Sequence, residues 1–113
     1  MSSTIKEKMY IAAKKFAIET IIEPQNHPEA VEDFEENFIK GAEWLLKNIE
    51  QLKEKSITEF ADTIDAVVEN HANSLFIQCE TSTFNEEEKD DLRDSFKYPF
   101  REGIDWAYDN NEE

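Results

Sequence analysis

The sequence predicts an all-α fold, a compact four-helix bundle built from two duplicated helical hairpins. Apolar residues recur at helical spacing along most of the chain. The chain has only 2 glycines and 3 prolines, and no Asn-Gly or Asp-Gly dipeptide indicates a β-hairpin. Its length of 113 residues fits a single domain over residues 1–113, with one hairpin in residues 1–55 and the other in residues 56–113.

The first helix is expected over residues 4–22, with Ser3 or Thr4 as its N-terminal cap. One apolar face begins at Ile5 and recurs at helical spacing through the following turns. A second apolar face consists of Ile11, Ile18 and Ile22. A helix that is apolar on two sides lies at the centre of a bundle or contributes to a contact between subunits.

Two prolines separate the first helix from the second, which is expected over residues 28–54. Pro24 cannot continue a helix, whereas Pro28 suits the first turn of the next one. This second helix has one apolar face and one face rich in Glu and Lys. Its apolar face repeats every seven positions, at Val31, Phe38, Leu45 and Leu52.

Capping residues set the starts of the last two helices. Ser56 and Glu59 have the Ser-x-x-Glu form of a capping box, which predicts a third helix over residues 57–80. Asn85 is the expected cap of a fourth helix over residues 86–109. Pro99 lies within that helix and is expected to kink or split it near Tyr98.

An eleven-residue pattern occurs twice, 62 positions apart, in the second and fourth predicted helices. Its form is F-x2-G-x-[ED]-W-x3-N, and the only two glycines and the only two tryptophans of the chain lie inside it. The repeat predicts a duplicated helical-hairpin unit. We expect a structural role for its conspicuous residues, which are Phe38, Gly41, Trp44, Phe100, Gly103 and Trp106.

Glycine inside a helix costs about 1 kcal/mol relative to alanine, so its use at the same place in both copies predicts a close approach to the backbone. Each tryptophan leans back over the glycine surface, or the two glycine faces oppose each other and let the helices cross closely. A ligand groove lined by the Trp and Gly residues is the functional alternative. The motif F-[IKR]-x-G-[AI]-[ED]-W also resembles a helical motif of small uncharacterised proteins of bacterial phages and mobile elements. That resemblance implies a genomic setting and no activity or site.

Charge limits the partners. Lys and Arg number 12 and Asp and Glu 27, so the net charge of −15 argues against direct binding to nucleic acid or to an anionic membrane. The acids concentrate at the starts of the second and fourth helices, where some offset the helix dipole and keep the surface solvated. Beyond that role, we expect them to bind a basic protein, through Glu86, Glu87, Glu88, Asp90, Asp91, Asp94, Glu32, Glu35 and Glu36.

The expected function is therefore that of a non-enzymatic acidic interaction protein. It would be a phage or mobile-element inhibitor that presents carboxylates in place of phosphates to a basic nucleic-acid-handling protein, such as a bacterial defence nuclease. Anti-CRISPR and anti-restriction proteins work on this physical basis. A structural or regulatory homo-oligomer is an alternative, because the first helix is apolar on two sides.

A second alternative is enzymatic. Glu59-x-x-Asp62 looks like a metal half-motif of the all-α nucleoside-triphosphate pyrophosphohydrolases related to MazG, with Glu32-x-x-Glu35 as its partner. Those enzymes hold Mg²⁺ between such pairs, because hard cations prefer clustered carboxylates. Helical spacing points Glu59 and Asp62 away from the apolar stripe of their helix, so we expect no enzymatic activity, cofactor or metal site.

The remaining reactive residues favour structural roles. His71 falls on the apolar stripe of the third helix, where we expect a buried neutral imidazole bonded to a neighbour. Cys79 is the only cysteine and suits a buried thiol. No stretch approaches the ~20 apolar residues of a membrane span, and Lys14 and Lys15 interrupt any signal-peptide core, so a cytoplasmic protein is expected.

Overall fold

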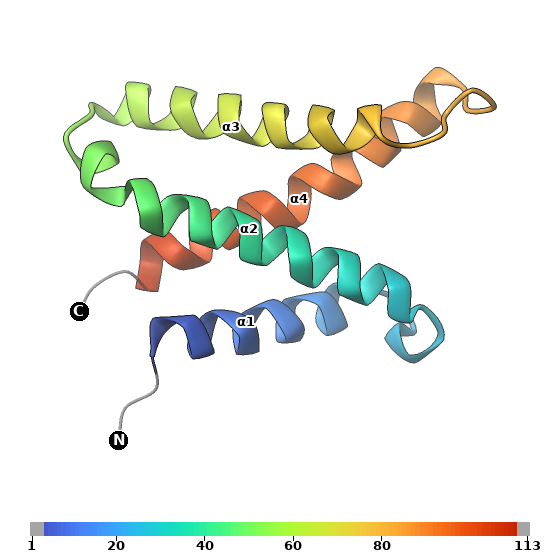
Figure 1. Cartoon of the computed structure of the whole chain (residues 1–113), viewed down its shortest axis with the longest axis horizontal. Helices are drawn as coiled ribbons and strands as arrows, with labels where there is room; N and C mark the ends of the chain where they lie inside the picture. Colours follow the sequence, from blue (N-terminus) through green and yellow to red (C-terminus); the bar gives the residue numbers. More distant parts are fainter. Residues whose placement is uncertain (1–3, 111–113) are drawn as a thin grey trace.

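A computed structural model describes residues 4–110, which form four α-helices and one short 3-10 helix (Figure 1). The elements are α1 (Ile5–Thr20), η1 (Pro24–Asn26), α2 (Pro28–Lys53), α3 (Ile57–Ile77) and α4 (Glu86–Asn110). Over this range no strand occurs, so the prediction of a compact all-α fold is confirmed. Each α-helix begins and ends within three residues of its predicted range.

The helix starts are held by the expected caps. The Thr4 hydroxyl accepts a backbone N–H of the first turn of α1 at 3.1 Å, and the Ser56 hydroxyl does the same for α3 at 3.2 Å. Asn85 and Glu88 form a complete capping box, since each side chain accepts the backbone N–H of the other, at 2.8 and 3.0 Å. Pro28 occupies the first position of α2.

The proline inside α4 does not split the helix. α4 continues past Pro99 for three more turns, to Asn110. Pro99 removes one backbone donor, but it is fully buried and precedes Phe100, which belongs to the core. Packing at this point therefore maintains the helix across the missing hydrogen bond.

The two longest helices cross in the middle of the molecule. In Figure 1, α2 and α4 form an X, with α1 along one side and α3 along the other. α1 packs mainly on α2, and α3 packs mainly on α4. The extents of 46 × 35 × 19 Å make the molecule about two helix diameters thick. All four helices contribute to the core, which consists of Met9, Ala42, Leu45, Ile49, Leu52, Ile64, Val68, Phe100, Ile104 and Ala107.

The crossing lies at the two glycines. A Cβ added to Gly41 would overlap the carbonyl oxygen of Phe100, and one added to Gly103 would overlap that of Phe38. Each glycine thus presents its Cα–H to a carbonyl of the other helix, a geometry in which weak Cα–H···O contacts form. Of the two packing arrangements that the sequence left open, the opposed glycines are the one found. The Trp106 ring lies against Phe38, with ring centroids 6.2 Å apart.

The helix pairs α1–α2 and α3–α4 resemble each other in which positions along the helices are buried. Residues 9–20 of α1 and 64–75 of α3 have identical sequences of buried, half-buried and exposed positions, at an offset of 55. The second helices correspond at an offset of 62. A ring contact occurs at the corresponding place in each hairpin: the Phe16 ring lies tilted against Phe38 with centroids 5.3 Å apart, and the His71 ring stacks on Phe100 at 4.1 Å.

The difference of seven residues between these offsets lies around the second turn. Relative to the first hairpin, α3 ends two residues later, α4 begins four residues earlier, and the connecting segment is one residue longer. The extra residues thus lengthen one end of the second hairpin without changing its contacts at the crossing.

Candidate functional site

The acidic cluster at the start of α4 is partly neutralised within its own helix. Glu86 pairs with Lys89 at 3.6 Å, Asp90 pairs with Arg93 at 2.8 Å, and Glu88 serves the capping box. The carboxylates of the other three predicted residues, Glu87, Asp91 and Asp94, take part in no ion pair or side-chain hydrogen bond among residues 4–110. Their spacing of i, i+4 and i+7 places them on one face of the helix. The structure thus reduces the six acids to an unpaired face of three, called here the α4 acidic face.

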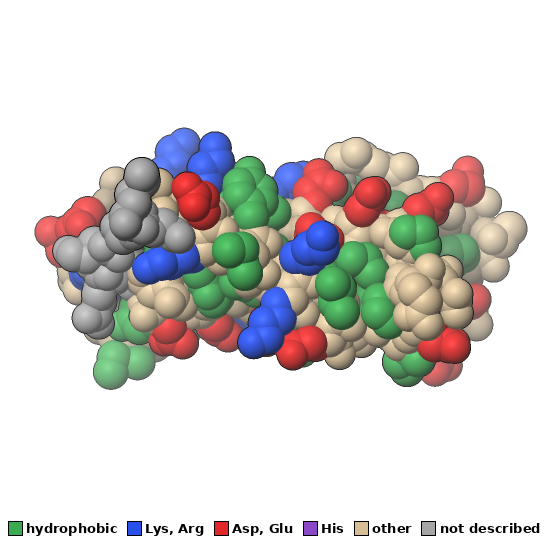
Figure 2. Space-filling view, turned by 90° about the horizontal axis from the view of Figure 1, so that it is seen from below, with side chains coloured by type: hydrophobic (Ala, Val, Ile, Leu, Met, Phe, Trp, Pro, Cys, Tyr) green, Lys and Arg blue, Asp and Glu red, His purple; other side chains and the backbone are tan. Residues whose placement is uncertain are grey.

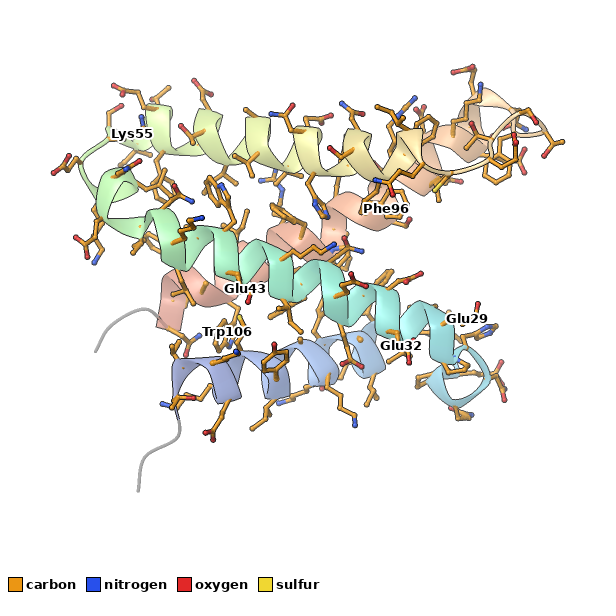
Figure 3. All side chains as sticks on the ribbon, viewed as in Figure 1. Glu29, Glu32, Glu43, Lys55, Phe96 and Trp106 are labelled. Carbon is orange, nitrogen blue, oxygen red and sulfur yellow. The ribbon has the colours of Figure 1, made fainter. Side chains whose placement is uncertain are left out.

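The acidic residues of α2 lie elsewhere. Glu32, Glu35 and Glu36 line a shallow groove beside α1, together with Tyr10. Glu36 pairs with Lys40 at 3.3 Å. Figure 3 shows Glu32 in the first turns of α2. The beginnings of α2 and α4 lie at the same end of the molecule but at opposite corners of it (Figure 1), so the predicted acids form two separate patches.

The geometry does not assemble the metal site of a pyrophosphohydrolase. Glu32 and Glu35 lie near the start of α2, whereas Glu59 and Asp62 lie at the start of α3, at the other end of the molecule (Figure 1). The 26 residues of α2 separate these ends by roughly 39 Å, at 1.5 Å per residue. Within residues 4–110, no group of three or more His, Cys, Asp or Glu side chains is placed to hold a metal ion.

His71 forms a polar bridge between α3 and α2, so the expected bond to a neighbour is found, although the imidazole is half-buried and not fully buried as expected. Its Nε2 lies 2.6 Å from Oδ1 of Asn37, and Nδ2 of Asn37 donates to the backbone carbonyl of Asp33 at 2.8 Å. The amide therefore presents its oxygen to the ring, so Nε2 of His71 carries a proton and donates it to Oδ1 of Asn37. Burial, and secondarily the charge of Lys40, lower the pKa of His71 from 6.5 to about 4.

Sequence reasoning missed a groove between α1 and the second half of α4. It has a volume of about 660 Å³ and an apolar floor that includes Phe16, Phe38 and Trp106. Figure 3 shows Trp106 on the side of α4 that faces α1. The α4 wall is acidic, with Glu102, Asp105 and Asp109, whereas the α1 wall carries Lys8 and Lys15 together with Glu19.

Two acids of this groove, Glu102 and Asp105, are partly desolvated. Burial, reinforced by the nearby Asp105, raises the pKa of Glu102. Burial also raises the pKa of Asp105, an effect that Arg101 partly offsets and Asp109 reinforces. Sequence signals of the groove were the second apolar face of α1 and its surplus of lysine, but only the packing of α1 beside α4 brings these acids opposite them.

The single cysteine lies just beyond the end of α3. Cys79 is a half-buried thiol whose Sγ lies 3.4 Å from the carbonyl oxygen of Leu75. No helix within residues 4–110 combines the length and the apolar character needed to cross a bilayer.

Comparison of this chain with protein-family models, curated proteins and solved structures finds no match.

Proposed function

We propose that this protein is a non-enzymatic acidic interaction protein that binds a basic, nucleic-acid-handling protein by presenting carboxylates where phosphates would lie. The observation that carries the proposal is the α4 acidic face. In a chain of net charge −15, Glu87, Asp91 and Asp94 stand on one helical face without a counterion from residues 4–110. Neighbouring carboxylates on such a face are ~5–6 Å apart, a spacing that several Lys or Arg side chains can engage together.

The physical cost of this arrangement favours a binding role. Like charges on one helix face repel each other and destabilise the helix by a few tenths of a kcal/mol per pair. The helix dipole and the capping box are already served by Glu86 and Glu88. A basic partner would remove the repulsion, and electrostatic attraction would speed its association. In keeping with the phage-like motif, we infer an inhibitor of a phage or mobile element, directed against a defence nuclease.

We further infer that the fold is one hairpin unit used twice. The shared order of burial and the reciprocal glycine contacts support this inference. So do the motif asparagines, since the amides of Asn48 and Asn110 donate to the carbonyls of Trp44 and Trp106 at 2.8 and 2.7 Å.

The test is affinity capture from a bacterial lysate with a variant of the α4 acidic face, in which Glu87→Gln, Asp91→Asn and Asp94→Asn are combined. The matched control combines Glu50→Gln, Glu54→Gln and Asp62→Asn at the other end of the molecule, so both variants carry a net charge of about −12. We expect a basic protein that binds the wild type and the control, is released by salt or by duplex DNA, and is lost from the α4 variant.

Two results would contradict the proposal. Equal capture by both variants would show that the α4 acidic face is not the binding site. Release of pyrophosphate from a nucleoside triphosphate by the purified protein with Mg²⁺ would show instead that the protein is an enzyme.

A further inference from the structure

α1 is a peripheral helix whose outer side is apolar. Ile11 and Ile18 are 67% and 44% exposed and lie opposite the face that buries Met9 and Ala13, and Ile22, just beyond the end of the helix, is 83% exposed. A helix that is apolar on two sides was expected to be either central or part of a subunit contact. α1 is not central, because it packs on the crossing from one side only (Figure 1), so the subunit contact remains. Figure 2 views this side and shows several apolar patches among basic and acidic side chains. Large apolar side chains gathered on one exposed side of a helix mark a candidate interaction site.

α3 shows what an equivalent helix carries when its outer side faces water. Residues 64–75 of α3 match residues 9–20 of α1 in burial position by position. At the offset of 55, however, Ile11 and Ile18 correspond to Ala66 and Asn73, whereas Ile22 corresponds to another exposed isoleucine, Ile77. Lys14 and Lys15 likewise correspond to an acid and a neutral amide, Glu69 and Asn70. The order of burial is the same over these twelve residues, so internal burial does not account for the difference in their outer residues.

The lysines of α1 have no acidic partner in the described chain. Residues 1–22 carry four lysines and two glutamates, whereas the rest of the chain carries a net charge of −17. Despite this excess of acids, Lys6, Lys8, Lys14 and Lys15 take part in no ion pair within residues 4–110. Across the groove, the desolvated acids Glu102 and Asp105 also lack an ion-pair partner from that range.

We propose that a second copy of this chain occupies this face, with α1 of each copy lying along the α1–α4 groove of the other about a twofold axis. The groove suits a helix whose apolar strip has lysines on the side that meets α4, because the floor is apolar and the α4 wall is acidic. Among the helices of residues 4–110, α1 presents that combination, with Ile11 and Ile18 beside Lys14 and Lys15. A twofold contact is self-complementary, because each copy contributes both the α1 strip that docks and the groove that receives the strip of the other copy.

The proposed dimer leaves the α4 acidic face exposed. The groove uses the second half of α4, from Glu102 to Asn110, whereas the acidic face is near the start of that helix. The dimer therefore goes beyond the proposed function and does not depend on it. It would give the protein two acidic faces, which would increase the avidity for a partner with repeated binding sites.

The first experiment is sedimentation equilibrium of the wild type over a range of concentrations, with circular dichroism to confirm that each variant folds. We expect a mass of twice 13.2 kDa that falls toward 13.2 kDa on dilution. The variant Ile11→Ala/Ile18→Asn gives α1 the outer residues of α3 and is expected to weaken the dimer at least tenfold, by roughly the free energy of burying one large apolar side chain. The control Ile57→Ala/Ile77→Asn removes two isoleucines that are 90% and 80% exposed, and should remain dimeric.

The second experiment exchanges charges across the groove. Lys8→Glu with Lys15→Glu should give a monomer, as should Glu102→Lys with Asp105→Lys, because each places like charges against the partner copy. The fourfold variant restores opposite charges and should be dimeric again. A wild type of 13.2 kDa at all concentrations, or a dimer unaffected by both the isoleucine and the charge variants, would overturn the proposal. So would a monomer that binds phosphatidylglycerol vesicles through Ile11 and Ile18, since the occupant would then be a lipid surface.

Discussion

Replacing either glycine at the crossing of α2 and α4 by alanine has two effects of opposite sign on the free energy of unfolding. Replacing Gly41 or Gly103 by alanine should stabilise an isolated helix by about 1 kcal/mol, because glycine is the poorer helix former. In the folded protein the added methyl would overlap the carbonyl oxygen of Phe100 or Phe38. It would also lie 2.9 Å from the carbonyl carbon of Phe100, or 2.8 Å from that of Phe38. These obstacles are backbone atoms that cannot rotate away, so the helices must separate.

The magnitude follows from that separation. A gap of 0.5–1 Å already removes about a quarter to a half of the dispersion energy of the atoms that face it. Overpacking of this kind costs about 1–3 kcal/mol, and the upper end applies because α2 and α4 form the main contact of the fold. After the gain in helix propensity, we expect each single variant to lose about 2 kcal/mol of unfolding free energy. The double variant should lose less than the sum, because one separation relieves both overlaps.

Urea unfolding followed by circular dichroism measures these differences. The control is Ala66→Gly, an exposed position in the middle of α3 where only helix propensity should act, with a loss of about 1 kcal/mol. If Gly41→Ala or Gly103→Ala stabilises the protein, or leaves its stability unchanged, the glycines are not needed for a close crossing. Strict additivity in the double variant would show that the two sites act separately.

Two further predictions concern titration and salt. Because the pKa of His71 falls from 6.5 in the unfolded chain to about 4 in the folded one, the unfolded state binds more protons between these values, and stability should fall as pH drops from 6.5 toward 4. After discounting for the access of water to this half-buried ring, the loss of unfolding free energy is about 1–2 kcal/mol. The variant His71→Phe should not show this loss when its urea midpoints at pH 7 and pH 5 are compared. A variant whose stability depends on pH as strongly as that of the wild type would contradict this account. Added NaCl should raise the melting temperature by screening the self-repulsion of a net charge of −15. A melting temperature that falls between about 0.02 and 0.3 M NaCl would show that the attraction within the five ion pairs of residues 4–110 outweighs this repulsion.

The sequence by itself determined the helices, their caps and the residues of the crossing. A helix is closed by bonds between residues four apart and is begun by a neighbouring side chain, so Thr4, Pro28, Ser56 and Asn85 locate the starts from local information. The repeated glycine also predicted a close approach, because no local benefit offsets its cost within a helix.

The tertiary structure decided which surfaces meet. The split expected at Pro99 is absent because burial at the crossing maintains α4, which a local rule cannot anticipate. The correspondence of α1 with α3 was hidden from the sequence because its offset of 55 differs from the 62 of the motif. Three of the six clustered acids of α4 have partners within that helix, and three do not. Which acids find a partner depends on side-chain geometry, which the sequence does not give.

The candidate dimer face illustrates the same division. Composition alone showed a lysine-rich first helix with isoleucines on a second side. The groove arises only when residues about 90 positions apart in sequence, such as Lys15 and Asp105, are brought to its two walls. Local sequence fixes what each helix face carries, because side-chain direction follows the helical period. Which faces are buried, paired or left exposed depends on long-range packing, and that packing was decided here by the contact of two backbones at Gly41 and Gly103.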